Sequence, residues 1–162
     1  MCPPFFREPA RIESPGTVDG GDVCEAGDHF FIGHSWRTNA EGARQLSEWL
    51  ARRGFQSSVV DIRRIPGMLH HKTGISWLGG RRLLAVGAIA GHEAFRGWEV
   101  VRVPDGEEYA ANCIRIHDAV LVARGFPATA ALLGELGHEV VPLEMSEYRK
   151  MDGGLTCLSV RW

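Results

Sequence analysis

The chain has 162 residues, a formal net charge of −2, 44% hydrophobic residues and 23% charged residues. This length suits one domain with a substantial core, and the near-neutral charge excludes the strongly basic surface typical of proteins that bind nucleic acids or anionic membranes. We expect neither a signal peptide nor a membrane span, because no apolar run has the necessary length and pattern.

The first 16 residues are rich in proline and polar side chains and predict an irregular arm. The clearest helix is expected over residues 38–54, where apolar residues recur every three or four positions. Thr38 and Glu41 have the spacing of an N-terminal capping box, and Gly54 is a suitable C-terminal stop.

The rest of the chain predicts a second helix and a series of short strands. Pro127 and the apolar run that follows it indicate a helix over 127–137, and His117 and Asp118 suit a tight turn between two strands. Residues 63–82 are dense in glycine and turn formers and show no clear period. Strands are expected at 28–35, 57–62, 82–87 and 98–104, on both sides of the tight turn within 113–125, and at 138–144 and 155–162.

The order of these elements forms a weak ββαβ repeat with a period of roughly forty residues. The repeat recurs around residues 22–62, 83–103 and 113–143. Units of this size cannot bury their apolar faces alone, so we expect an α/β fold in which neighbouring units pack radially or as a solenoid.

Two polar stretches lie where a core alone would not need them. Asp19 and Asp22 bracket two glycines, a spacing that suits two carboxylates facing one cation, although the same composition is typical of a turn with capping aspartates. Arg37 stands just before the predicted helix and suits a bidentate contact with a carboxylate. The alternative for Arg37 is a surface side chain packed on Trp36.

Two further stretches contain groups that titrate or react near neutral pH. His70 and His71 lie in a loop, where one of them suits an acid or base, and Cys157 follows a Gly-Gly turn. Taken singly, each is more typical of a surface histidine or a buried thiol. Together with the carboxylates and the arginine, they form a set that suits attack by a thiol on the guanidinium carbon of an amino-acid substrate. Reduced thiols in a cytoplasmic protein are expected, since the cysteines form no CxxC pair.

Five stretches of the chain match a known family in the order in which that family has them. They are "RIESPGTVDGGDV", "GDHFFIGHSWRTNAEGARQL", "LHHKTG", "YAANCI" and "SEYRKMDGGLTCLSV". Through them residues 11–162 resemble the dimethylarginine dimethylaminohydrolase family of the guanidino-group-modifying, or pentein, superfamily. The resemblance implies a five-bladed α/β propeller of ββαβ modules, with residues 1–10 as an N-terminal arm and residues 11–162 as the C-terminal part of a catalytic domain.

The resemblance also implies a hydrolytic mechanism without a cofactor or metal. Cys157 corresponds to the nucleophile that attacks the guanidinium carbon of methylated arginine, a small-molecule substrate. His70, rather than His71, corresponds to the histidine that protonates the departing amine and then activates water. The implied product is citrulline, released from a covalent thiouronium intermediate.

Four more residues correspond to groups that bind substrate or shape the site. Asp19 matches the carboxylate that holds the guanidinium nitrogens, and Arg37 matches an arginine that binds the α-carboxylate. Met151 has the position whose backbone carbonyl contacts the α-amino group, and Asp152 follows it in the turn. Asp22 belongs to the same glycine-rich motif as Asp19, where a structural role and a catalytic role are equally expected.

The chain departs from the family in one respect. About three ββαβ modules are expected here, and the family has five, so an N-terminal part with further substrate contacts is expected to be missing. An incomplete propeller exposes sheet edges, which favours a homo-oligomer or aggregation.

Three alternatives to the dimethylargininase reading remain. An arginine deiminase-like hydrolase has related chemistry, and a catalytically impaired member or binding protein retains only the fold. A metal site at Cys157 and His70 is disfavoured, because two ligands are too few for structural zinc.

Overall fold

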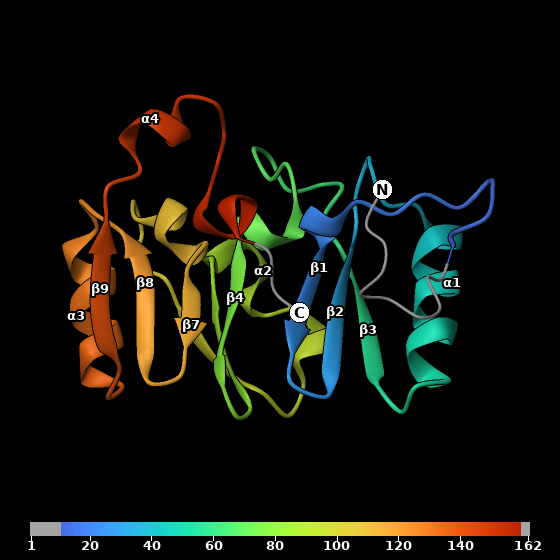
Figure 1. Ribbon diagram of the computed structural model, residues 1–162, viewed down its shortest axis with the longest axis horizontal. Coiled ribbons are helices and arrows are strands. Elements are labelled where there is room, and N and C mark those ends of the chain that lie inside the picture. Colours follow the sequence, from blue (N-terminus) through green and yellow to red (C-terminus); the bar gives the residue numbers. More distant parts are fainter. Residues whose placement is uncertain (1–10, 160–162) are drawn as a thin grey trace, which may run out of the picture.

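Three ββαβ modules follow one another along the chain in a computed structural model that describes residues 11–159 (Figure 1). The predicted arm at residues 1–10 lies outside the described residues. Each module forms its own three-stranded sheet, in which the first strand is antiparallel to the second and the third is parallel to the second. The predicted ββαβ repeat is therefore confirmed.

The first module contains β1 (Val23–Ala26), β2 (His29–His34), α1 (Ala40–Ala51) and β3 (Gln56–Asp61). A short 3-10 helix, η1 (Gly20–Asp22), precedes it. The apolar stripe predicted for α1 is present, since this helix packs on β2 and β3.

The predicted capping box of α1 is wrong. Asn39 is the N-cap, and its Oδ1 accepts a hydrogen bond of 2.8 Å from the backbone N–H of Gly42. Thr38 is buried, and its hydroxyl donates to Asp22 instead. Glu41 pairs with Arg44 one turn later, so the residues of the expected box have other partners.

The second module contains β4 (Ile75–Gly79), β5 (Arg82–Ala85), α2 (Gly87–Ala90), η3 (Glu93–Phe95) and β6 (Glu99–Arg102). The residues that form β4 show no clear period in the sequence. This strand lies between the first strands of the other two modules and is largely buried on both faces, so apolar and polar residues do not alternate along it.

The third module contains β7 (Ile114–Ile116), β8 (Ala119–Ala123), α3 (Pro127–Glu135) and β9 (Glu139–Leu143). The predicted tight turn between β7 and β8 is confirmed, with His117 at a φ of 55°. Short helices outside the modules carry much of the site. The helix η2 (His71–Thr73) precedes β4, and η4 (Glu108–Ala111) precedes β7. The helices α4 (Ser146–Arg149) and η5 (Leu155–Leu158) follow β9.

The strand predicted for residues 155–162 is wrong over the part that the structure describes. Residues 155–158 form η5, and the last three residues lie outside the described range. A strand requires a neighbouring backbone edge for its hydrogen bonds. Here the backbone N–H of Thr156 bonds to the side chain of Asn112, and that of Cys157 bonds back to Gly154.

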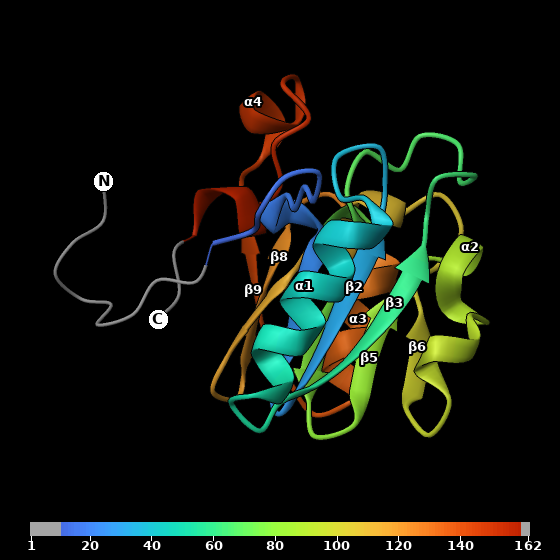
Figure 2. The same cartoon turned by 90° about the vertical axis from the view of Figure 1, so that its right-hand side faces the viewer.

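The modules are arranged with β1, β4 and β7 next to one another and the helices α1, α2 and α3 on the outer side (Figures 1 and 2). This is the arrangement of propeller blades around an axis, as the fold prediction requires. One hydrophobic core passes through all three modules and includes Phe31, Leu84 and Val120, none of which is exposed. Among residues 11–159, no helix combines the length and apolar character needed to span a membrane.

Candidate active site

Asp19 is the N-cap residue of η1. This short helix leads into β1 at the end of the strand opposite the β1–β2 hairpin (Figure 1). Its Oδ1 accepts a hydrogen bond of 2.8 Å from the backbone N–H of Gly21. This bond, followed by the proximity of His70 and Arg37, lowers the pKa of Asp19 against the opposing effect of partial burial. Asp19 is therefore a carboxylate at neutral pH, as contact with a guanidinium requires.

His70 and Arg37 both approach Asp19. The Nδ1 atom of His70 lies 3.6 Å from Asp19 Oδ1, and the Nη1 atom of Arg37 lies 3.4 Å from Asp19 Oδ2. The approach depends on Gly21, because a Cβ atom at this position would lie 2.7 Å from the imidazole ring of His70. The glycine-rich motif thus brings together three of the predicted site residues.

Asp22 has a different environment from Asp19. It is fully buried and accepts hydrogen bonds from the Ser35 hydroxyl (2.6 Å), the Thr38 hydroxyl (2.7 Å) and the backbone N–H of His71 (3.0 Å). These protein donors occupy its carboxylate and join η1, the start of α1 and η2. The contacts support the structural alternative for Asp22 over substrate binding.

The two adjacent histidines differ sharply in burial. The side chain of His70 is 17% exposed, whereas His71 is fully buried. Burial lowers the pKa of His71 to about 4, so this side chain is neutral at physiological pH. Only His70 has both access to solvent and a carboxylate beside its ring, which supports the choice made from the sequence.

Cys157 is an exposed free thiol on η5. The segment before it forms a tight turn in which Asp152 has a φ of 55° and the N–H of Gly153 bonds to the carbonyl of Tyr148. Met151, at the start of this turn, is 84% exposed. The turn therefore presents the thiol at the surface and does not bury it as a core residue.

Asn112 connects the Cys157 turn with the segment after His70. Its Nδ2 donates to the carbonyl of Lys72 and to the hydroxyl of Thr156, and its Oδ1 accepts from the N–H of Thr156, all at 2.9 Å. Asn112 lies in the matching stretch "YAANCI", but no sequence pattern predicts a role for it. An asparagine two residues before a strand is a weak signal on its own.

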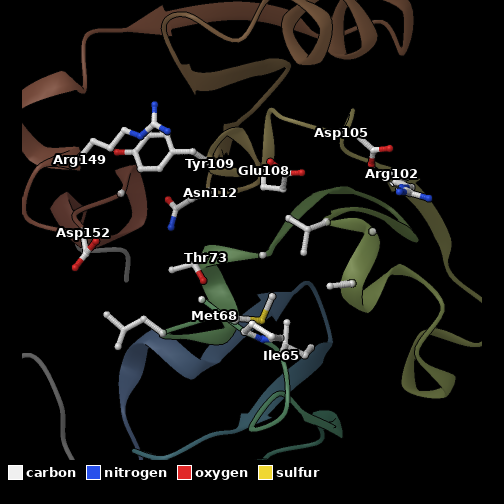
Figure 3. A pocket seen from close by; sticks show the side chains of 18 residues that line it. Ile65, Met68, Thr73, Arg102, Asp105, Glu108, Tyr109, Asn112, Arg149 and Asp152 are labelled. Carbon is white, nitrogen blue, oxygen red and sulfur yellow. Dashed lines mark hydrogen bonds and ion pairs between the residues drawn. The ribbon is translucent and has the colours of Figure 1, made fainter.

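A cavity of about 470 Å³ lies beside these segments (Figure 3). Arg149 and Tyr109 lie on one side of it, and Ile65 and Met68 lie on the other. Of the seven predicted site residues, all within the described range, only Asp152 lines this cavity. The cavity adjoins the site through η2 and the Cys157 turn, and the group around Asp19 lies outside it.

The arrangement supplies the parts of a nucleophilic site. It contains an exposed thiol, a histidine beside a carboxylate, and an arginine near the same carboxylate. An imidazole can both donate and accept a proton, so a histidine close to a carboxylate suits acid–base catalysis. The second group of predicted residues, Met151 and Asp152, lies in the turn that leads to the thiol.

Comparisons with known proteins relate the chain to one group of enzymes. No protein-family model matches the chain. A dimethylarginine dimethylaminohydrolase from Pseudomonas aeruginosa is 44% identical over 94% of this chain and 59% of its own length. One from Streptomyces coelicolor is 34% identical over 93% of this chain and 56% of its own length.

A solved structure of the Pseudomonas aeruginosa enzyme has the same fold. It is a cysteine-to-serine mutant complexed with citrulline, and it matches with a TM-score of 0.86 at 43% identity. The match covers 94% of this chain and 58% of that chain. The chain thus spans a little under three-fifths of the length of the relatives that it matches.

Proposed function

We propose that this chain is a member of the dimethylarginine dimethylaminohydrolase family, to which it is similar in sequence and fold. In this proposal it carries the nucleophile and the acid–base histidine of a hydrolase acting on N-methylated arginine. The observation that carries the proposal is the meeting of His70 and Arg37 at Asp19, together with an exposed Cys157 on a turn that Asn112 links by hydrogen bonds to the segment after His70.

The first step of the proposed reaction forms a covalent bond to sulfur. The Cys157 thiolate attacks the guanidinium carbon and forms a tetrahedral adduct. The C–N bond to the methylated nitrogen then breaks, and His70 supplies the proton with which methylamine or dimethylamine departs. The electron pair of the broken bond leaves with the amine, so a thiouronium remains on Cys157.

The second step uses water as the nucleophile. His70, now unprotonated, takes a proton from water as the water attacks the thiouronium carbon. The carbon–sulfur bond breaks, and citrulline departs from the regenerated thiolate. No redox change occurs at any stage, and no cofactor is needed for the balance of atoms.

The remaining site residues have proposed roles in binding the small-molecule substrate. The Asp19 carboxylate faces the guanidinium nitrogens, and its lowered pKa keeps it charged when the cation binds. Arg37 binds the α-carboxylate as a charge-assisted pair. The Met151 carbonyl and Asp152 receive the α-amino group. The proposed compartment is the cytoplasm, where a reducing environment keeps an exposed thiol such as Cys157 reactive.

Turnover tests the proposal directly. Citrulline release would be measured from asymmetric dimethylarginine and from arginine, with the wild-type chain and with Cys157→Ser. We expect release from the methylated substrate that falls by at least about a hundredfold in Cys157→Ser, because the hydroxyl is a much weaker nucleophile.

Cys113→Ala is the matched control for loss of a thiol. Cys113 is fully enclosed, and burial raises its pKa to about 11, so this thiol is unreactive and its removal leaves turnover intact. Release from arginine alone would indicate a deiminase. No release from either substrate by folded protein would contradict the proposal.

A further inference from the structure

Asn112 lies between η4 and β7 and is 4% exposed. Its three side-chain hydrogen bonds reach two segments that are far apart in the sequence. One bond goes to the carbonyl of Lys72, two residues after His70, and two go to Thr156, directly before Cys157. A single buried amide therefore joins the histidine segment to the cysteine segment, and we refer to these three bonds as the Asn112 bridge.

The Cys157 turn lies tightly against the bridge. A Cβ atom at Gly154 would lie 2.6 Å from the Cγ atom of Asn112, so only glycine permits this approach. The hydroxyl of Tyr109 donates to the carbonyl of Gly153 at 2.5 Å and holds the same turn from a second side. Burial raises the pKa of Tyr109, and the proximity of Cys157 acts in the same direction, which agrees with a turn packed against this ring.

The turn needs external support because η5 is only four residues long. A 3-10 helix of this length has little stability of its own. The N–H of Cys157 bonds within the turn, to the carbonyl of Gly154, and so does not tie the nucleophile to the rest of the molecule.

We propose that Asn112 is a positioning residue that fixes the Cys157 turn against the segment of His70. This inference rests on the proposed function for its kinetic consequence, although the bridge itself is a property of the fold. Nucleophile and proton donor must approach one carbon atom together, and a displacement of about 1 Å can lower a rate a hundredfold. Asn112 does not touch the substrate carbon; it acts through Thr156 and Lys72.

The bridge requires an amide, because it uses a donor and an acceptor of one side chain at once. An aspartate at position 112 keeps an acceptor for the N–H of Thr156 and loses both donated bonds. An alanine loses all three bonds. Thr156→Val removes one acceptor and leaves Asn112 in place, so the three variants weaken the bridge to different degrees.

Hydrogen exchange of backbone amides tests the bridge without any turnover. In Asn112→Ala we expect exchange at least about tenfold faster in peptides covering residues 153–159 and in peptides covering residues 70–74, since both segments lose a partner. Asn112→Asp and Thr156→Val are expected to give smaller increases. If Asn112→Ala does not fold, these two variants carry the test.

Thr129→Val is the matched control. Thr129, in the first turn of α3, is also fully buried, and its hydroxyl donates to Glu107, the N-cap residue of η4. Its backbone N–H also donates to Glu107, so neither donor is bonded to residues 70–74 or 153–159. This variant likewise removes one buried hydrogen bond, so it reports general loss of stability. It should leave exchange at residues 70–74 and 153–159 unchanged.

Kinetics of the same variants test the consequence for the reaction. For Asn112→Ala we expect kcat for dimethylarginine to fall by about ten- to a hundredfold while KM changes by less than about threefold, with partial recovery of kcat in Asn112→Asp. Unchanged exchange at both segments, or unchanged kcat in an active protein, would overturn the inference. Faster exchange in a chain without turnover would uphold the bridge and contradict only the proposed function.

Discussion

His71 shows how strongly burial changes the behaviour of a titratable side chain. The backbone N–H of His71 donates a hydrogen bond to Asp22. It is adjacent to His70 and has the same imidazole side chain, yet that side chain is completely buried. Such a group does not transfer protons with solvent. It couples the stability of the fold to pH instead, because burial disfavours its charged form.

The stability of the chain should therefore fall in acid. The pKa of His71 is lowered from 6.5 to about 4, so between these values the unfolded state binds a proton that the folded state does not. Each unit of decreasing pH then lowers the free energy of unfolding by up to about 1.4 kcal/mol from this group alone. Urea unfolding at several pH values, for wild type and His71→Phe, would measure this slope.

The carboxylates are the same in the wild type and in His71→Phe, so they contribute equally to the pH dependence of the free energy of unfolding in the two proteins. The difference between the two slopes therefore isolates His71. We expect the slope of His71→Phe to be shallower over this range. Identical slopes would show that His71 is not buried in its neutral form.

At the scale of elements, the site depends on connections between short helices. Asp22 joins η1, the residues before α1, and η2 through three hydrogen bonds. Asp22→Ala leaves two hydroxyls and one backbone N–H without their acceptor, which should lower the free energy of unfolding by about 3 kcal/mol. Thermal or denaturant unfolding measures this change.

Asp105→Ala is a suitable control for removal of an aspartate. Asp105 pairs with Arg102, but its side chain is 83% exposed. Removal of such a surface partner should change the free energy of unfolding by less than about 1 kcal/mol. Equal effects of the two substitutions would contradict a structural role for Asp22.

The elements also show what sequence patterns can and cannot predict. Helix α1 and the β7–β8 turn have local signals, namely an apolar stripe and a residue pair suited to a tight turn, and both are present. The segment of β4 lacks such a signal because other modules cover it on both sides. The tail forms η5 because of its contact with Asn112, more than forty positions away, which no local pattern reveals.

The candidate site could be predicted only with the help of the family resemblance. Residue types and spacing suggested a thiol, a histidine and carboxylates, but not that His70 and Arg37 meet at Asp19. The resemblance selected His70 over His71, and the complete burial of His71 supports that choice. The Asn112 bridge was not predicted, since its partners become neighbours only through the packing of the modules.

At the scale of the whole molecule, the site draws on every part of the described chain. Asp19 and Arg37 belong to the first module, His70 precedes the second, and Cys157 follows the third. One continuous core joins the modules, so these residues keep their relative positions only while all three modules are packed together. Loss of packing in any one module should therefore displace the site residues of the other modules as well.

The most direct test of the account is to trap the covalent intermediate on sulfur. The wild-type chain would be mixed with asymmetric dimethylarginine, quenched in acid within the first turnovers, digested, and analysed by mass spectrometry. We expect a substrate-derived thiouronium on the peptide that contains Cys157 and none on the peptides of Cys24 or Cys113. Citrulline formation without any adduct on Cys157, or an adduct that persists in Cys157→Ser, would contradict it.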